Sequence, residues 1–495
     1  MAWLGLLAYS VTRASISAGE TFLENRGLAK KITEMRLAPG LVLLIALSFP
    51  KVARTGPSSS YTIEQAVAAA EAQNPDVQIA RKKVQGAHGG VMEARSGYLP
   101  SIVSTGLFRE RQHQTDSRLR DEDYNASVRL TQNLYSAGAV PSAVAIARLN
   151  LEKQELELKA VSNQVAMDVR VAFNELLLNK AKIRVREQSV GVLQEELKTQ
   201  QERLAAGTVG QLNVSRAEVA LASEQPQLVD AQTQLSNSYL RLTQLCGIDS
   251  KSNPEILGQL QYHPRRPDLN ECLARADTER PEIRAKQIDV EIEDRQAALD
   301  RSELRPQVEA FSGYEVYNER DPQVGPEFNH GYVIGVNARW HIFDGFATKG
   351  KLIATQARRE AAVQSLEATR RTVAAEVRSA FLDLQQADHV LESETRNVQT
   401  ADESLEVAKA NARAGLGTQL DVLQAASDIT RTRTTRLSAI YLHNVAVAKL
   451  ARACAVTPDG LDFSRRLTKD ETRQKEESSA RAMDVAQPPA RLTKQ

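Results

Sequence analysis

The segment of this chain that most resembles a catalytic loop is His88-Gly89-Gly90. Esterases use a His-Gly-Gly loop to hold an oxyanion, and they pair it with a serine nucleophile in a Gly-x-Ser-x-Gly turn. The chain has no such serine turn, and His88 lies in the middle of a stretch with helical periodicity. We therefore interpret these glycines as places where helices pack closely, and not as an oxyanion loop.

The residues that usually hold metals are scattered. Seven histidines occur without a His-Glu-x-x-His motif or a Cys/His cluster of zinc spacing: His88, His113, His263, His330, His341, His389 and His443. We expect the three cysteines, Cys246, Cys272 and Cys454, to be small buried residues and not a disulfide or a metal site. Phosphate-binding glycine motifs are absent as well. The sequence predicts no enzyme, no metal and no cofactor.

The charge of the chain is balanced. Lysine and arginine number 63 against 62 acidic residues, which leaves no broad basic field for nucleic acid. Aromatic residues make up only 5% of the 495 residues. The remaining composition favours long helices over a compact mixed fold.

Most of the chain consists of two copies of one sequence repeat. Leu134 to Cys246 aligns without a gap on Ile342 to Cys454 at an offset of 208 residues (342 − 134). An earlier block repeats at an offset of 206, so that Asn74-Pro75 falls on Arg280-Pro281 (280 − 74). An unbroken alignment of this length indicates a duplication.

In each copy, apolar and polar residues alternate along a stretch that is typical of a β-hairpin. In the second copy Tyr332, Ile334, Val336, Ala338, Trp340 and Ile342 lie on one face, and Asn337, Arg339 and His341 on the other. Four strands cannot close a barrel, which needs about eight, and an open sheet in lipid would leave edge amides unpaired. Assembly between chains would supply the missing strands. A soluble sheet with one face packed on a core stays open as the alternative.

The rest of each copy predicts a hairpin of long helices. From about 140 to 206 no proline follows Pro141, and a helix of that length would extend about 100 Å. Apolar residues recur at heptad spacing, which indicates coiled-coil packing. These seam residues are Leu176, Ile183, Val190, Leu197 and Leu204, and then Leu384, Leu391, Val398, Leu405 and Ala412. Glycine-bearing turns end both long helices.

These patterns set the expected organisation. Each repeat contains one β-hairpin, at 101–135 or 307–343, followed by one long helical hairpin, at 138–247 or 346–455. The expected parts are an N-terminal extension with a signal peptide at 1–60, a first repeat at 61–248, a linker at 249–267, a second repeat at 268–456 and a disordered tail at 457–495.

A short apolar stretch, 37–49, follows Lys30, Lys31 and Arg36 and suits a secretory signal peptide. A conventional signal peptide would start at Met35, so translation from Met1 or from Met35 stays open. A single membrane anchor or a buried helix is the alternative for this stretch.

The chain resembles the TolC family of outer-membrane efflux and secretion channels over roughly 61–456. The resemblance rests on the Asn74-Pro75 helix break, on Leu134-Tyr135-Ser136-Ala137-Gly138 and Ile342-Phe343-Asp344-Gly345, and on both glycine-bearing tips. It implies a mainly α-helical fold with membrane β-strands. It further implies a homotrimer with a twelve-stranded outer-membrane barrel in lipid and a periplasmic helical barrel. The implied partners are a periplasmic adaptor and an inner-membrane transporter.

The resemblance also implies roles for particular residues. Asp421 stands where family members carry an acidic ring at the pore gate, while Gln424 stands where some members have a second acid. The adaptor would dock on the tips, which are Gly207, Thr208, Val209 and Gly210 in the first repeat and Gly415, Leu416, Gly417 and Thr418 in the second. Without the resemblance, Asp421 is a surface carboxylate or a local cap, and the tips are ordinary helix ends.

Two functions follow from these patterns. The first is a passive exit duct of a tripartite efflux pump or a type I secretion system, in the outer membrane with a periplasmic helical extension. Its residues Tyr332, Ile334, Val336, Ala338 and Trp340 would face lipid. The alternative is a soluble periplasmic coiled-coil scaffold, which the heptads alone would allow.

Overall fold

The structure is a computed structural model that describes residues 60–110, 122–248, 255–318, 321, 323 and 328–461. The expected signal peptide, apart from Ser60, and residues 462–495 of the expected tail lie outside these residues. None of the helices in the described ranges is long and apolar enough to cross a membrane.

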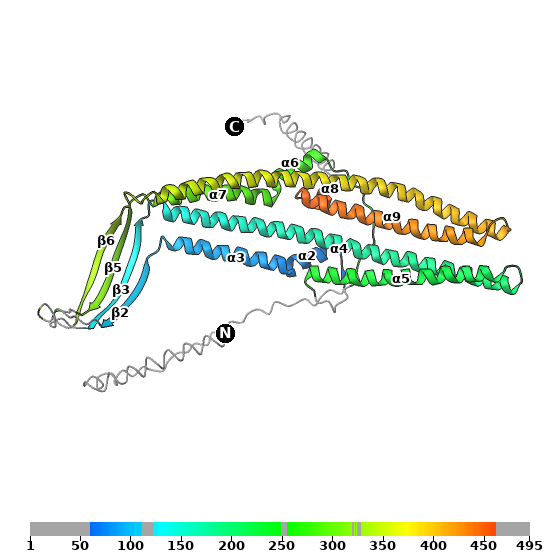
Figure 1. The fold of residues 1–495 in the computed structure, drawn as a ribbon, viewed down its shortest axis with the longest axis horizontal. Helices are drawn as coiled ribbons and strands as arrows, with labels where there is room; N and C mark the ends of the chain where they lie inside the picture. Colours follow the sequence, from blue (N-terminus) through cyan, green and yellow to red (C-terminus); the bar gives the residue numbers. More distant parts are fainter. Residues whose placement is uncertain are drawn as a thin grey trace, which may run out of the picture. The chain divides into compact units, whose positions relative to one another are not determined.

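Matching elements appear in the two repeats in the same order (Figure 1). The first repeat contains β1 (Ser60–Tyr61), α2 (Ile63–Gln73), α3 (Pro75–Ser96), β2 (Ser101–Glu110), β3 (Glu122–Tyr135), α4 (Ala139–Ala205) and α5 (Gln211–Cys246). The second contains β4 (Glu255–Ile256), α6 (Leu269–Glu279), α7 (Pro281–Ser302), β5 (Gln307–Tyr317), β6 (Asn329–Arg339), α8 (Ala347–Ala414), α9 (Gln419–Ala453) and η1 (Pro458–Leu461).

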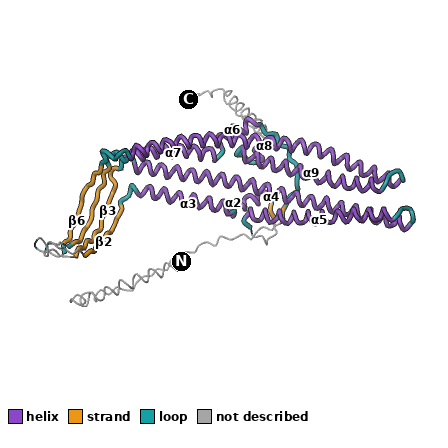
Figure 2. The backbone as a smooth tube through the Cα atoms, in the orientation of Figure 1, coloured by secondary structure: helices purple, strands orange, loops and turns teal. Residues whose placement is uncertain are grey.

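The strands and the helical turns lie at opposite ends of the long helices (Figure 2). The helices α4 and α8 have 67 and 68 residues, so each is about 100 Å long. Beside α4, α3 runs from the sheet and α5 continues to the tip, and α7 and α9 do the same beside α8. Each repeat therefore pairs one continuous long helix with two shorter helices that lie end to end beside it.

The break between the shorter helices is fastened in the same way in both repeats. Asn74 caps α3 through the amide of Asp76, and its side-chain amide donates to the carbonyl of Leu245 over 2.8 Å. Arg280, at the equivalent position, donates to the carbonyl of Ala453 and pairs with Glu376 at 3.0 Å. A buried residue before the proline thus ties each short helix to the end of the long hairpin.

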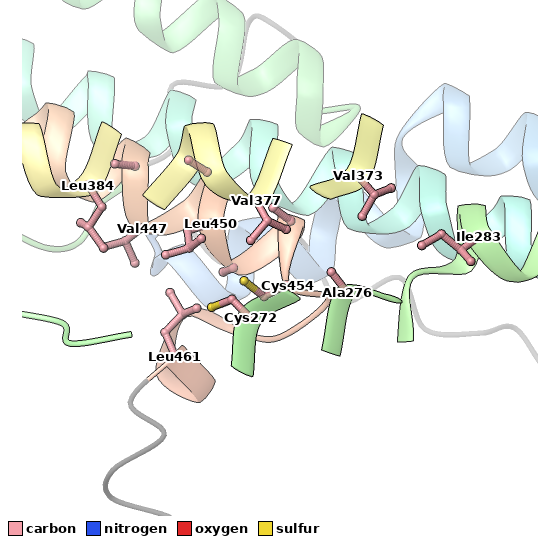
Figure 3. Packing of buried hydrophobic residues seen from close by; sticks show 14 residues of the cluster. Cys272, Ala276, Ile283, Val373, Val377, Leu384, Val447, Leu450, Cys454 and Leu461 are labelled. Carbon is pink, nitrogen blue, oxygen red and sulfur yellow. The ribbon is translucent and has the colours of Figure 1, made fainter. Parts of the chain in front are cut away.

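The core is divided between the two repeats. One cluster forms where α2, α4 and α5 meet, around Val169, Leu176 and Cys246. The other forms around α6, α8 and α9 and includes Cys272 and Cys454 (Figure 3). These clusters lie at equivalent places of the duplication, near the middle of the long helices.

The heptad seam is buried more fully in the second repeat than in the first. Leu384, Leu391, Val398 and Leu405 are all buried, whereas in the first repeat only Leu176 is. Residues three positions along, Leu193 and Gln200, are buried there in place of Val190 and Leu197. The first seam is rotated because α4 also packs against α7 and α9, so its buried stripe serves several neighbours.

Three expectations differ from the structure. Apart from α3 itself, none of the described residues lies within 4 Å of a Cβ placed at Gly89 or Gly90, so close packing within one protomer does not explain these glycines. The ordered chain extends beyond 457, because η1 buries Leu461 in the second core cluster. Trp340 lies beyond the end of β6, and its indole N–H donates to the carbonyl of Leu304.

Candidate pore and docking surfaces

The four longer strands form one antiparallel sheet in the order β2-β3-β5-β6. The two hairpins, far apart in the sequence, join through β3 and β5, where Val128 lies opposite Tyr314. Both outer strands, β2 and β6, have an unpaired edge among the described residues. An exposed edge carries free amide and carbonyl groups that can pair with another strand.

The two faces of this sheet differ sharply in polarity. Residues that lie opposite one another across the strands share a face. One row of the first face is Ile102, Leu130, Ser312 and Ile334, and the next is Ser104, Val128, Tyr314 and Tyr332. Tyr332 is 83% exposed and Ile334 is 73% exposed. Large apolar side chains at this exposure need a nonaqueous neighbour, because a patch of this size is rare on a soluble surface.

The opposite face carries the polar side-chain pairs of the sheet. Arg129 pairs with Glu315 at 2.9 Å, and Thr105 lies 2.8 Å from the hydroxyl of Ser127. Asn337 donates to Glu309 over 3.0 Å. A sheet with one apolar and one hydrogen-bonded face is suited to a barrel wall between lipid and an aqueous lumen.

Exposed aromatic residues gather where the sheet meets the helices. Phe343 and Phe346 are largely exposed, and their ring centroids lie 5.4 Å apart. Tyr135 and Trp340 are exposed at the same junction. Aromatic girdles mark the interfaces of membrane barrels, so this junction has the composition of the periplasmic boundary.

At the other end of the long helices, glycines in the left-handed conformation end α4 and α8. Gly207 has φ +68° and Gly415 has φ +72°, a conformation that costs glycine little. The turn of the second repeat exposes 82% of Leu416. Gln419 donates to the carbonyl of Asn213 over 2.9 Å, which ties the two tips together.

The first tip is closed differently. Thr208 donates its hydroxyl to the carbonyl of Arg203 over 2.9 Å, and Gly210 begins α5 without a side-chain cap. A cleft lies between the two tips, and Val209, Gly417 and Thr418 are among its lining residues. Its charged lining consists of Glu195, Glu196, Arg203, Arg216, Lys409 and Arg413. The cleft therefore offers both apolar and charged groups to a partner.

Asp421 has a structural task of its own at the second tip. Its Oδ2 accepts hydrogen bonds from the amide and the hydroxyl of Thr418, both over 2.8 Å, and completes a capping box at the start of α9. The backbone bond from Thr418, and then the side-chain bond, hold the pKa of Asp421 below its ordinary value. The carboxylate is exposed and stays ionised.

A second hollow runs along α8 and α9 and contains both expected gate residues. Asp421, Gln424 and Asp428 line it, with Glu394 further along. Gln424 donates to Asp428 over 3.3 Å, and Asp428 pairs with Arg431 at 2.8 Å. Asp428 was not predicted from the sequence, although helical periodicity places it two turns after Asp421 on the same face.

The described ranges contain no group of three or more His, Cys, Asp or Glu residues that could hold a metal ion. His88 lies exposed within α3, away from any loop.

Taken with this geometry, comparison with known proteins shows the family of the chain. The model of the outer membrane efflux protein family matches residues 66–248 and 272–456, which are the two repeats. The chain therefore belongs to the outer membrane efflux protein family, a family of transport proteins. The protein is located in the outer membrane and has a helical part in the periplasm.

Individual relatives are distant but cover most of the chain. Protein CyaE of Bordetella pertussis is 25% identical over 76% of this chain and 79% of its own length. Outer membrane protein TolC of Vibrio cholerae is 24% identical over 73% of this chain and 83% of its own length. The structure of the CmeC outer membrane channel of Campylobacter jejuni matches with a TM-score of 0.68 at 14% identity, over 82% of this chain and 88% of that one. That likeness supports the fold.

Proposed function

We propose that this protein is the passive exit duct of a tripartite efflux pump or a type I secretion system. The observation that carries the proposal is the two-faced sheet with two unpaired edges, placed at the end of duplicated long helices. A scaffold of coiled coils needs no such sheet. The duct would carry substrates from a periplasmic adaptor and an inner-membrane transporter to the exterior, and the partner would supply the energy.

The duct is a homotrimer in this proposal. One chain supplies four strands, and three chains supply twelve, which exceeds the about eight strands that a barrel needs. The strands alternate in direction, so β6 of one protomer is antiparallel to β2 of the next and can pair with it. Closure removes every unpaired edge amide from lipid. The exposed faces of Tyr332, Ile334, Val336 and Ala338 then face lipid, with Trp340 at the interface below them.

Purified protein in planar lipid bilayers tests the function. A duct should produce discrete conductance steps, and particle images in detergent should have threefold symmetry. A protein that stays in solution without detergent and opens no pores would contradict the proposal. Deletion of residues 332–342 separates the alternatives further, because a helical scaffold tolerates the loss of β6 and a barrel does not.

The two tips are the proposed docking surface for the adaptor. Leu416 projects from the turn of α8 and α9 with 82% of its surface exposed, beside the cleft that Gly417 and Thr418 line. Apolar groups that project in this way are typical anchors of interfaces. The tip of the first repeat, Gly207 to Gly210, forms the opposite wall through Val209.

Leu416→Asp should therefore weaken docking strongly without damage to the duct. Loss of one anchor and burial of a charge cost roughly 2 kcal/mol or more, which weakens binding about thirtyfold. Co-purification of the channel with the adaptor expressed in the same cells measures the effect. The variant must keep its trimer and its conductance for the result to count, and undiminished co-purification would place the docking surface elsewhere.

Asp421 is the proposed gate residue. Three symmetry copies would bring three ionised carboxylates around the channel axis, where they favour cations and repel anions. Asp428 would add a second acidic position in place of Gln424, partly neutralised by Arg431.

A further inference from the structure

The two cysteines of the second core cluster lie against each other. Cys272 comes from α6, Cys454 follows the end of α9, and neither side chain has any exposed surface. Both are free thiols in this structure and belong to the same buried cluster. Figure 3 shows both sulfur atoms side by side, with Ala276, Leu450 and Leu461 among their neighbours in the cluster.

The first repeat contains the same pair of positions and shows independently that they lie in contact. By the offsets of the repeat, Cys272 falls on Ala66 (272 − 206) and Cys454 falls on Cys246 (454 − 208). In the first repeat the Cys246 thiol donates to the carbonyl of Ala66 over 3.5 Å. The two equivalent positions therefore touch in both copies. Only in the second copy do both carry sulfur.

We propose that Cys272 and Cys454 form a disulfide bond in the mature protein. The chain belongs to the outer membrane, and its helices lie in the periplasm, a compartment in which disulfides form and persist. The bond would tie α6 to the end of α9. Cys246 has no partner sulfur and remains a thiol.

The reaction is an exchange with the disulfide of a periplasmic thiol oxidase. The Cys272 thiolate attacks one oxidase sulfur, and the other oxidase sulfur leaves as a thiolate and takes up a proton. Cys454 then gives up its proton and attacks the Cys272 sulfur, which releases the second oxidase thiol. Two electrons and two protons pass to the oxidase, which leaves reduced.

The thiolate is the nucleophile, and the disulfide that results is the same whichever of the two cysteines reacts first. Because both sulfurs are fully buried in the folded chain, the exchange takes place before α6 packs onto α8 and α9.

The bond would make the two repeats unequal. In the first repeat α2 is held by packing and by the hydrogen bond from Cys246 to Ala66, whereas in the second α6 would be held covalently. A cross-link that closes a loop this long, from 272 to 454, restricts the unfolded chain strongly. The second core cluster should therefore resist unfolding better than the first.

Counting thiols in the full-length protein tests the bond directly. Protein taken from the outer membrane is quenched in acid, denatured and alkylated before and after reduction. Of the three cysteines, one should be labelled before reduction, at Cys246, and all three afterwards. Three labelled thiols before reduction would overturn the proposal. The count does not depend on conductance, so its outcome is separate from that of the exit duct.

Two variants test the geometry and the consequence. Ala66→Cys places a second sulfur beside Cys246, and we expect no labelled thiol before reduction, whereas two labelled thiols would contradict the argument from the repeat. Cys272→Ala should lower the unfolding temperature by several degrees more than the matched Cys246→Ala, because it also removes the cross-link. Equal losses would mean that Cys272 contributes packing alone.

Discussion

Replacing Ile334 with arginine should prevent assembly of the channel in the outer membrane. Ile334 lies at the middle of β6 on the apolar face, in one row with Leu130 and Ile102. An arginine at the midplane of a bilayer costs about 2–4 kcal/mol in each protomer. Each 1.4 kcal/mol is a factor of ten in an equilibrium constant, so three copies together should leave little trimer. Trimer in outer-membrane fractions is the quantity to measure.

The adjacent residue provides the matched control. Val333 lies on the polar face, in one row with Arg129 and Gly313, where the lumen would be. Val333→Arg should leave assembly largely intact and change only conduction. If both variants assembled equally well, the apolar face would not face lipid. If both failed, the strand would be intolerant of any charge, and the two faces would not be distinguished.

Removal of the Asp421 charge should lower the preference of the channel for cations and weaken block by multivalent cations. Three carboxylates close to one axis act together on a multivalent ion, so block at low salt should weaken on the order of tenfold or more. The effect should shrink as salt rises, because the screening length is about 10 Å at 0.1 M. Reversal potentials and block of single channels in planar bilayers measure both quantities.

The capping box requires two different substitutions at this position. Asp421→Asn keeps an oxygen that can accept from Thr418, whereas Asp421→Ala removes the cap as well as the charge. Equal effects of the two variants would assign the change to charge. Glu406→Gln is the matched control, since Glu406 is an exposed acid near the same tip that does not line the hollow. Unchanged selectivity in Asp421→Asn would place this carboxylate away from the pore axis.

The lowered pKa of Asp421 gives the same experiment a pH dependence. Its carboxylate keeps its charge at a pH where an ordinary aspartate begins to take up a proton, because Thr418 donates two hydrogen bonds to the ionised form. Cation selectivity should thus survive mild acidification. The stability contributed by the cap is present above the pKa of the unfolded chain and is lost as pH falls through the lower pKa of the folded one.

The sequence located the elements well because their signals are local. Alternation of apolar and polar residues is visible within one strand, and helical periodicity within one helix. The repeat itself places the second copy once the first is known, so the sequence alone predicts both β-hairpins and both helical tips. The resemblance to the family rests on the turns and helix breaks between these elements, such as Asn74-Pro75 and the two glycine-bearing tips.

The errors came where distant neighbours decide the outcome. Gly89 and Gly90 have the composition of a packing site, yet no other element of the described protomer packs against them. Trp340 continues the alternation of β6, but the ladder ends at Arg339 and the Trp340 indole N–H donates to Leu304. Leu461 belongs to a stretch of polar composition and is buried in a cluster that α6 and α8 complete with the end of α9.

By itself the sequence determined the duplication, the periods of strand and helix and the positions of the turns, because each depends on residues a few places apart. Only the tertiary structure decided that β3 pairs with β5 and that Cys272 meets Cys454 while Cys246 meets Ala66. These contacts join residues separated by long stretches of chain. Packing selects them, and no local pattern records that selection.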